Sequence, residues 1–463
     1  MSDEPKRSPG VNAAGSAPSR TVLRRVAGAV LLGSALEWYD YFLFGAAAAL
    51  VFDTVFFPSH DPAVAVLLSL ATFGAGFVAR PVGAVVFGRI GDKYGRRPAL
   101  VATVLLMGLA TTAMALIPPH ASIGVWAPIL LVIARLLQGM GSGAEYSGAS
   151  VFAVEYAPKN RRGLYGSLSA AGVYLGMVLS SATVLLVTTL TTEDQFASWG
   201  WRIPFLASLV LVALGLWIRV RLDETPAFEH EVAGTAEKPT ASLRTVLRTE
   251  WRSMILVAAL VAAPLALSHL YQVFALSYLD SSGYSAGIGT LGLMIAGVTV
   301  MVTAPLAGVA SDRFGRRPVL MTGAGFAIAF AFPFFWLVDS GQPGLAVLAM
   351  AVAQGGSVGI AFGVQGVLLA ELFSTGGRYS GAAISREAAA VVFGGFAPFL
   401  AATLSASAGG APWPVALYVI ALGLITLIGG WCAPETSRRS LTVPAADSPG
   451  VDGATADVVD HQR

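Results

Sequence analysis

Ionisable side chains interrupt several long apolar stretches of this 463-residue sequence. A charged side chain at the centre of a bilayer costs about 2.5–3.5 kcal/mol, so it usually faces a cavity or a partner. Glu37 and Asp40 lie three residues apart, on neighbouring parts of one helix face, and Glu145 lies in a later apolar stretch. Carboxyl groups in such surroundings can exchange protons near neutral pH. These three acids are therefore candidates for reversible protonation, and the sequence leaves open which of them carries the proton.

Two arginines in apolar stretches, Arg135 and Arg386, are candidates to bind a substrate carboxylate. A guanidinium can hold a carboxylate through two parallel hydrogen bonds. Gln138 follows Arg135 by one helical turn and shares a helix face with Glu145. Glu387 directly follows Arg386, but adjacent helical residues point about 100° apart. The two therefore need not pair with each other.

Other polar residues of these stretches have two interpretations each. His269, with Tyr271 and Tyr278, either lines or gates a transport path, or is a packed residue that hydrogen-bonds locally. Arg80 either faces such a path or lies close enough to the inner membrane surface to extend its charged end into water.

The elements that position these residues are predicted to be membrane-spanning helices. Only 12% of the residues are charged and 55% are hydrophobic, whereas soluble domains are about 25% charged. A net charge of +2 is too small to indicate nucleic-acid binding, and the single Cys432 can form no intrachain disulfide. The sequence has no phosphate-binding loop and no metal-spaced Cys/His set. We therefore expect neither an enzyme nor a bound cofactor or metal.

Twelve apolar stretches are long enough to cross a bilayer, which requires roughly 20 residues per helix. They lie near 26–56, 64–88, 98–118, 124–156, 163–191, 200–221, 252–280, 286–310, 318–338, 344–372, 379–407 and 412–433. The predicted organisation is a disordered N-terminus (1–23), a first six-helix bundle (24–222), a linker (223–250), a second six-helix bundle (251–434) and a disordered tail (435–463).

The basic residues predict how the chain is oriented. With the N-terminus in the cytoplasm, 25 of the 29 lysines and arginines fall on the cytoplasmic side, and the predicted outer loops carry none. Cytoplasmic loops of membrane proteins are enriched in lysine and arginine. We therefore expect a multi-pass protein of the cytoplasmic membrane, with both termini in the cytoplasm.

The two halves of the chain carry the same loop. The sequence GRIGDKYGRRPAL (88–100) returns as GVASDRFGRRPVL (308–320), 220 residues later. The spacing between Glu155 and Arg162 also returns, 216 residues later. Two matched halves with a site between them are the layout of many secondary transporters. The predicted fold is therefore an all-α membrane protein with twelve transmembrane helices in two pseudo-symmetric six-helix bundles.

The doubled loop and the twelve spans resemble the major facilitator superfamily. Within it, four segments are similar to the metabolite:proton symporter family, namely SALEWYDYFLFG (34–45), FVARPVGAVVFGRIGD (77–92), RLLQGMGSGAEYSG (135–148) and WGWRIPF (199–205). The resemblance covers residues 24–434 and implies the major facilitator fold. It also implies uptake of organic acids, shikimate-like compounds, or proline and betaine, and it links the arginine of the fourth span to proton coupling.

The resemblance further implies a latch between the bundles. Asp92 would meet the start of the eleventh helix, and Asp312 and the fifth helix would form the corresponding pair, because the positive end of a helix dipole favours a carboxylate. We interpret Glu155 and Glu371 as gate partners of loop arginines rather than as proton carriers. The predicted gate and latch residues are Asp92, Arg96, Arg97, Glu155, Arg162, Asp312, Arg316, Arg317, Glu371 and Arg378.

We therefore expect a proton-coupled symporter that imports a small organic acid by alternating access, around a central chamber open to water. Its expected partners are the substrate, the proton and the lipid bilayer, without nucleic acid, and a monomer is expected to suffice. A zwitterion such as proline or betaine is the alternative substrate. A membrane sensor that keeps the carrier fold without transporting is the alternative of another class, although such a protein would tolerate neutral residues at positions 40, 135 and 145.

Overall fold

A computed structural model describes six ranges of the chain. They are residues 20–58, 61–94, 96–143, 145–221, 251–373 and 378–437. Every regular element in these ranges is helical. A helix satisfies its own backbone hydrogen bonds, which is what an apolar segment in a bilayer requires. The predicted linker and most of both predicted disordered ends lie outside the described residues.

The first half of the chain forms six long helical segments joined by short connections. Its elements are α1 (Arg20–Leu50), α2 (Phe52–Val55), α3 (Pro62–Tyr94), α4 (Arg96–Leu116), α5 (His120–Ile123), α6 (Trp126–Gly141), α7 (Glu145–Tyr156), η1 (Lys159–Arg161), α8 (Arg162–Leu190), α9 (Glu193–Gln195), η2 (Phe196–Gly200) and α10 (Arg202–Arg221). The fourth predicted span consists of α6 and α7, which are separated by a turn at Ser142 and Gly143.

The second half repeats this arrangement. Its elements are α13 (Trp251–His269), η3 (Leu270–Phe274), α14 (Ala275–Ser281), α15 (Ala286–Phe314), α16 (Arg316–Val338), α17 (Pro343–Ala353), η4 (Gln354–Gly359), α18 (Ile360–Leu372), α19 (Arg378–Ala389), η5 (Ala390–Gly395), α20 (Ala397–Ser407) and α21 (Trp413–Cys432). Three of its spans contain a π-helical segment (η3, η4 and η5). Such segments are frequent at functional sites, and here one follows His269 and another lies close after Glu387.

The described helices match the twelve predicted spans in order. Eight helices are long and apolar enough to cross a membrane, and the pair formed by residues 193–200 and 202–214, bent by 47°, is a ninth. The other three spans are α1, α4 and the α6–α7 pair. The apolar parts of α4 and α6 are shorter, and α1 carries Glu37 and Asp40 in its interior. The all-α prediction is confirmed.

Two predicted boundaries need correction. The first helix begins at Arg20, inside the segment that we expected to be disordered up to residue 23. At the other end, Glu435 and Thr436 make side-chain hydrogen bonds with the helical body, so ordered structure continues into the predicted tail. The first extension, RTVL (20–23), directly precedes the predicted first span, whereas the second, ETS (435–437), is polar and lacks the apolar pattern from which the spans were predicted.

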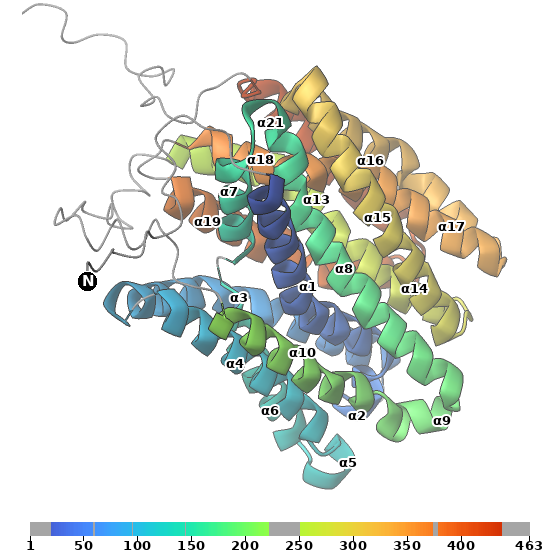
Figure 1. The fold of residues 1–463 in the computed structure, drawn as a ribbon. Helices are drawn as coiled ribbons and strands as arrows, with labels where there is room; N and C mark the ends of the chain where they lie inside the picture. Colours follow the sequence, from blue (N-terminus) through green and yellow to red (C-terminus); the bar gives the residue numbers. More distant parts are fainter. Residues whose placement is uncertain are drawn as a thin grey trace, which may run out of the picture.

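Helices from the two halves pack against each other along several seams. Figure 1 shows α8 of the first half running along α15 of the second. Glycines allow this close approach, because a Cβ added to Gly308 would lie 2.5 Å from the carbonyl oxygen of Gly163. Along another seam, a Cβ on Gly74 of α3 would lie 2.9 Å from the carbonyl oxygen of Gly395. The seams enclose an interior made by both halves.

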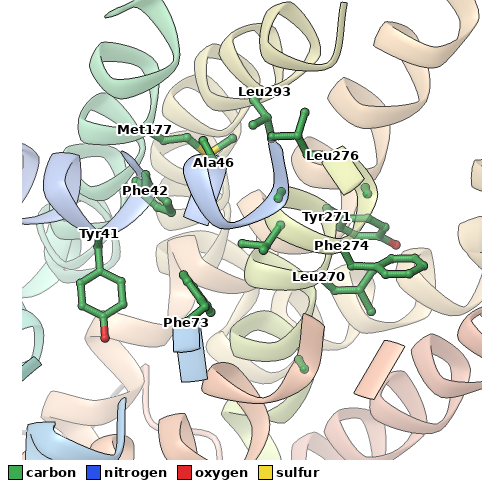
Figure 2. Close-up of a cluster of buried hydrophobic side chains, with 14 of the residues drawn as sticks. Tyr41, Phe42, Ala46, Phe73, Met177, Leu270, Tyr271, Phe274, Leu276 and Leu293 are labelled. Carbon is green, nitrogen blue, oxygen red and sulfur yellow. The ribbon is translucent and has the colours of Figure 1, made fainter. Parts of the chain in front are cut away.

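Much of this interior is apolar. Figure 2 shows Phe42 and Phe73 of the first half in the same buried cluster as Leu270 and Leu293 of the second. Large side chains from both halves therefore fill the space between the bundles. The polar groups described next are embedded in this packing.

Candidate functional site

Four buried charged side chains meet between the two halves. Arg80 of α3 and Glu37 of α1 belong to the first half, whereas Arg386 and Glu387 of α19 belong to the second. Arg80 Nε lies 2.9 Å from Glu387 Oε2, and Arg80 Nη2 lies 3.8 Å from Glu37 Oε1. Arg386 Nη1 donates a 2.7 Å hydrogen bond to Glu387 Oε1. None of these side chains is more than 4% exposed. We call these four residues the charged cluster.

The cluster decides two points that the sequence left open. Arg80 does not extend to the membrane surface, because its side chain is fully buried and pairs with Glu387. Arg386 and Glu387 do pair, although they are adjacent in the helix. The long arginine side chain can curl back over its own backbone, which overcomes the angular separation of neighbouring positions.

Aromatic rings surround both arginines of the cluster. The guanidinium carbon of Arg80 lies 5.3 Å from the ring centroids of Trp38 and Tyr41. That of Arg386 lies 4.0 Å from the ring centroid of Tyr146. Ring faces attract cations more strongly when the cation is shielded from water. The rings therefore hold the two guanidinium groups in place away from solvent.

Some donors of the cluster have no partner. Among the described residues, Nε and Nη2 of Arg386 and Nη1 of Arg80 have no hydrogen-bond acceptor, although they are buried. Leaving such donors unpaired is costly. Nε and Nη2 lie on one edge of the guanidinium, and that edge matches the two oxygens of a carboxylate. The arrangement therefore suits an anionic group bound between the halves.

A second polar group lies entirely within the first half. The Thr111 hydroxyl donates a 3.0 Å hydrogen bond to Asp40 Oδ2. Gln138 Nε2 donates to Thr111 Oγ1 over 2.8 Å, and Arg135 Nη1 donates to Gln138 Oε1. The other carboxylate oxygen, Asp40 Oδ1, has no hydrogen-bond partner among the described residues. Asp40 is thus a buried carboxyl group whose contacts in the described residues are neutral.

Arg135, the other arginine considered for carboxylate binding, lies among aromatic rings of the first half, and its role in binding a substrate together with Arg386 stays a prediction. The Arg135 guanidinium carbon lies 4.0 Å from the Tyr41 ring centroid and 4.1 Å from that of Phe44, within the first half. The reason is the position of α6, which packs on α3 and α4. Arg80 on α3 meets the second half instead.

The remaining candidates of the first half are only partly described. The side chain of Glu145 lies outside the described residues, so the prediction that it exchanges protons stays a prediction. Its neighbour Tyr146 is fully buried beneath Arg386. The first turn of α7 therefore does contribute to the surroundings of the charged cluster.

His269 lies in an aromatic layer contributed by both halves. Its ring centroid is 6.3 Å from that of Trp38, with the planes nearly parallel, and 5.3 and 5.0 Å from those of Phe73 and Phe77. Along α3, Phe73 and Phe77 precede Arg80, whereas the repeated loop follows it. The layer and the loop therefore lie on opposite sides of the charged cluster.

Tyr271 does not join this layer. Its ring packs against Phe334, 5.0 Å away, within the second half. Figure 2 shows Tyr271 beside Phe274 and apart from Tyr41 and Phe73. Tyr278, the other tyrosine considered with His269, donates a 2.8 Å hydrogen bond to Asp339 Oδ1 near the end of α16. Both tyrosines therefore contact α16 or its end within the second half.

The expected water-accessible chamber is closed in this structure. The charged side chains contact each other and the surrounding rings directly, and they are almost completely buried. One pocket, lined by Val257, Gln365 and Leu368 among others, encloses about 10 Å³, about the space of one water molecule. Within the ranges that the structure describes, the polar groups thus lie at the interface of the halves without an open path to them.

A latch closes the side of the molecule that carries the repeated loop. Asp312 accepts hydrogen bonds from the backbone N–H groups of Gly163 and Leu164, over 2.8 and 3.1 Å. These groups lie in the first turn of α8, where the helix dipole favours an anion. Arg316 Nη1 contacts the same carboxylate over 2.7 Å. This contact between Asp312 and the fifth span is the one that the family resemblance implied.

The second half supplies further latch contacts. Arg316 Nε lies 3.2 Å from Glu371 Oε2, and the Thr436 hydroxyl donates to the same oxygen over 2.7 Å. Arg317 donates through Nε to the carbonyl oxygen of Gly430, over 2.8 Å. Glu371 therefore pairs with a loop arginine, as a gate partner would, and the segment that follows α21 joins the network through Thr436.

Glu435 caps the first turn of α16. Its two carboxylate oxygens accept hydrogen bonds from the backbone N–H groups of Arg316 and Arg317, over 2.9 and 3.1 Å. Partial burial acts to raise the pKa of this carboxyl group. Hydrogen bonds from the backbone N–H groups of Arg316, Ser437 and Arg317 outweigh that effect and hold the pKa below its usual value.

Several predicted gate residues are only partly described. The side chains of Asp92, Arg96, Arg97 and Arg378 lie outside the described residues. Glu155 is exposed near the end of α7, and Arg162 is buried at the start of α8. The proposed first-half counterpart of the Asp312 latch therefore stays a prediction.

Sequence reasoning undervalued Arg80 and missed Thr111 and Tyr146. Arg80 had a detectable signal, since it is a charge in an apolar run. Thr111 and Tyr146 had none, because a threonine or tyrosine in a membrane helix is ordinary, and only packing shows that they contact Asp40 and Arg386. Within the described part of the chain, no group of three or more His, Cys, Asp or Glu side chains is placed to hold a metal ion.

Comparison with known proteins identifies the family to which this architecture belongs. The family model described as Major Facilitator Superfamily matches residues 30–395. The inner membrane metabolite transport protein YhjE of Escherichia coli (strain K12) is 40% identical over 423 residues, covering 89% of this chain and 94% of that protein. The shikimate transporter of the same strain is 37% identical, covering 90% and 95%. The proline/betaine transporter of Salmonella typhimurium is also 37% identical, covering 92% and 86%.

Solved structures agree on the fold. A crystal structure of a D-xylose-proton symporter superposes with a TM-score of 0.70 at 19% identity, covering 91% of this chain and 99% of that one. A partially occluded, inward-open form of the Escherichia coli xylose transporter XylE gives 0.72 at 18% identity, covering 91% and 100%. The similar proteins are transporters and not enzymes. This chain therefore belongs to the major facilitator superfamily and is a multi-pass transporter of the inner membrane.

Proposed function

We propose that this protein is a proton-coupled symporter that imports a small organic acid by alternating access. The observation that carries the proposal is the charged cluster, which combines arginines and acids of both halves and leaves one edge of the Arg386 guanidinium unpaired. Charges buried in this way are costly, so within membrane helices they usually serve binding or coupling. A carboxylate bound there would contact both bundles, so its arrival and departure would change the contacts between them.

The closed interior is consistent with an intermediate of alternating access. On one side, the latch joins Asp312 to the start of α8. On the other side, the aromatic layer around His269 joins the halves. Opening either closure while the other holds would expose the charged cluster to one side of the membrane only. A ligand can drive this exchange to the extent that it binds the two states differently.

Asp40 is the preferred proton carrier in this proposal. It is buried, hydrogen-bonded to the neutral Thr111, and has one carboxylate oxygen without a hydrogen-bond partner among the described residues. It connects through Thr111 and Gln138 to Arg135, so its protonation can change the position of that arginine. The driving force would be the proton gradient, worth about 2.3 kcal/mol per charge for each 100 mV.

The proposal also covers the orientation of the chain in the membrane and the number of chains in the transporting unit. The distribution of basic residues supports cytoplasmic positions for both termini and for the latch. One chain supplies every residue of the cluster, which supports a monomer as the transporting unit. The partners are then the substrate, the proton and lipid.

The test is uptake into proteoliposomes that contain the purified protein. The panel comprises shikimate, benzoate, lactate and nicotinate as monocarboxylates, with proline and glycine betaine as zwitterions. We expect a monocarboxylate to accumulate against its gradient when the lumen is alkaline, and accumulation to stop when a protonophore is added. Transport of the zwitterions alone would favour the alternative substrate class, which the proline/betaine relatives support. Folded protein that moves none of them would favour the membrane sensor.

A further inference from the structure

We propose that Glu387 is a built-in stand-in for the substrate carboxylate. In the empty transporter it pairs with both Arg80 and Arg386, and an arriving carboxylate displaces it from Arg80. The inference rests on the proposed function above. It adds that pairing of Glu387 with both arginines allows the empty protein to return for the next substrate.

The geometry of Glu387 is that of a bridging anion. One of its carboxylate oxygens lies 2.9 Å from Arg80 Nε in the first half, and the other accepts a 2.7 Å hydrogen bond from Arg386 Nη1 in the second. Its carboxylate is therefore shared between two arginines that approach from opposite bundles. Glu37 differs, because its 3.8 Å contact with Arg80 stays within the first half.

An arriving carboxylate has a place to bind beside Glu387. The Nε and Nη2 edge of Arg386 and Nη1 of Arg80 have no acceptor among the described residues. A substrate carboxylate that takes the free edge of Arg386 and turns toward Arg80 competes with Glu387 for Arg80. Glu387 then keeps its existing ion pair with Arg386 Nη1.

The charges of the cluster explain why a stand-in is needed. The empty cluster holds two positive and two negative side chains and is neutral. Unbalanced charge buried between packed helices is strongly unfavourable. Without Glu387, the empty cluster would carry one excess positive charge, and only a bound anion would neutralise it. An empty transporter of that kind would reorient slowly, whereas a loaded one would not.

The decisive variant is Glu387→Gln, studied in proteoliposomes. The labelled probe is whichever monocarboxylate of the panel the wild type transports fastest. We expect counterflow exchange to persist, with a half-saturation concentration about tenfold lower than that of the wild type, which corresponds to about 1.4 kcal/mol. The rate of net uptake into empty vesicles should fall at least tenfold, because net uptake requires the return of the empty protein. Glu193→Gln, at an exposed position in α9, is the matched control and should leave both measurements unchanged.

A double variant separates charge balance from damage to the fold. Arg80→Gln combined with Glu387→Gln removes one charge of each sign, so the empty cluster is neutral again. We expect it to regain net uptake relative to Glu387→Gln alone, with a higher half-saturation concentration because one arginine is missing. If Glu387→Gln does not fold, Glu387→Asp replaces it. The shorter side chain reaches Arg80 less well and should lower the half-saturation concentration by a smaller factor.

The outcomes are distinct from those of the previous test. Carboxylate transport by the wild type, together with unchanged net uptake in Glu387→Gln, would overturn the stand-in role and leave the proposed function intact. A rise in half-saturation concentration in Glu387→Gln would overturn it as well, since Glu387 would then bind a cationic part of the substrate. Absence of carboxylate transport by the wild type would overturn both proposals.

Discussion

At the scale of single residues, the charges inside the membrane fall into two groups with different surroundings. Arg80, Arg386 and Glu387 are paired across the halves. Asp40 instead contacts the hydroxyl of Thr111, inside one half. A paired acid and an acid with neutral contacts suit different tasks, because the paired acid sits in direct contact with cationic side chains and the other does not. This difference supports the proposed division of tasks, with anion binding at the cluster and proton exchange at Asp40.

The assignment of Asp40 predicts the effect of removing its charge. The variant Asp40→Asn keeps the shape of the side chain but cannot exchange a proton. We expect it to lose accumulation of the substrate driven by a pH gradient, while counterflow exchange stays partly intact. Uptake and counterflow in the same proteoliposomes measure both properties.

The control for this prediction is Asp194→Asn, which changes an exposed acid in α9. It should accumulate substrate as the wild type does. Wild-type accumulation by Asp40→Asn would remove Asp40 from the proton path and return attention to Glu37 and Glu145.

At the scale of helices, glycines decide how closely the two halves approach. A Cβ on Gly308 of α15 would meet the backbone oxygen of Gly163 and, at 2.8 Å, the hydroxyl of Ser167. A backbone atom cannot move aside as the end of a flexible side chain can. The contact lies next to the latch, since Gly163 also donates to Asp312. Packing of α8 on α15 and formation of the latch therefore depend on each other.

The variant Gly308→Ala should destabilise this seam. Inserting a methyl group into close packing costs about 1–3 kcal/mol, so we expect a lower thermal unfolding midpoint in detergent. Gly325→Ala in α16 is the matched control, because a Cβ there would have no neighbour within 4 Å. Alanine is also favoured over glycine within a helix by up to about 1 kcal/mol. Equal midpoints for the two variants would contradict close packing at the α8–α15 seam.

The cap on α16 predicts a pH-dependent contribution to stability. The pKa of Glu435 is lowered in the folded protein, so its contribution is present above the pKa of the unfolded chain. It is lost as the pH falls through the lowered folded value, where the carboxylate is protonated. We expect Glu435→Gln to lower the unfolding midpoint at neutral pH and to match the wild type in acid. Glu193→Gln serves as the control, and a difference that grows toward low pH would contradict the cap.

At the scale of the whole molecule, closure on two sides is the main feature. The latch closes one side of the charged cluster and the aromatic layer closes the other. Large apolar side chains from both halves fill the remaining interface (Figure 2). In the alternating-access mechanism that we propose, the bundles separate on one side at a time. The seams formed by α8 with α15 and by α3 with η5 are the contacts that this movement must change.

The proposed orientation makes a prediction that uses the single cysteine. Cys432 is the last residue of α21, is exposed, and precedes the segment that joins the latch. If the latch faces the cytoplasm, a membrane-impermeant maleimide should label Cys432 in inside-out vesicles and not in intact cells. Cys432→Ser should abolish the labelling. Labelling in intact cells would reverse the orientation.

The sequence alone was sufficient for the architecture. The number and order of the spans could be predicted because an apolar helix of about 20 residues satisfies its own hydrogen bonds, so each span is a local property. The repeated loop is also a local feature of the sequence, and it indicated the two halves. The short polar extension at Glu435 escaped prediction because its order comes from contacts with distant residues.

Only the tertiary structure decided which charges meet. Arg80, Arg135 and Arg386 look alike in the sequence, as charges in apolar runs. Packing of α3 at the seam places Arg80 against Glu387, while α6, which packs behind α3, keeps Arg135 within the first half. Pairing across a helix interface depends on which face each helix turns toward its neighbour. That choice is made by the contacts of the whole assembled bundle and not by the local pattern around any one residue.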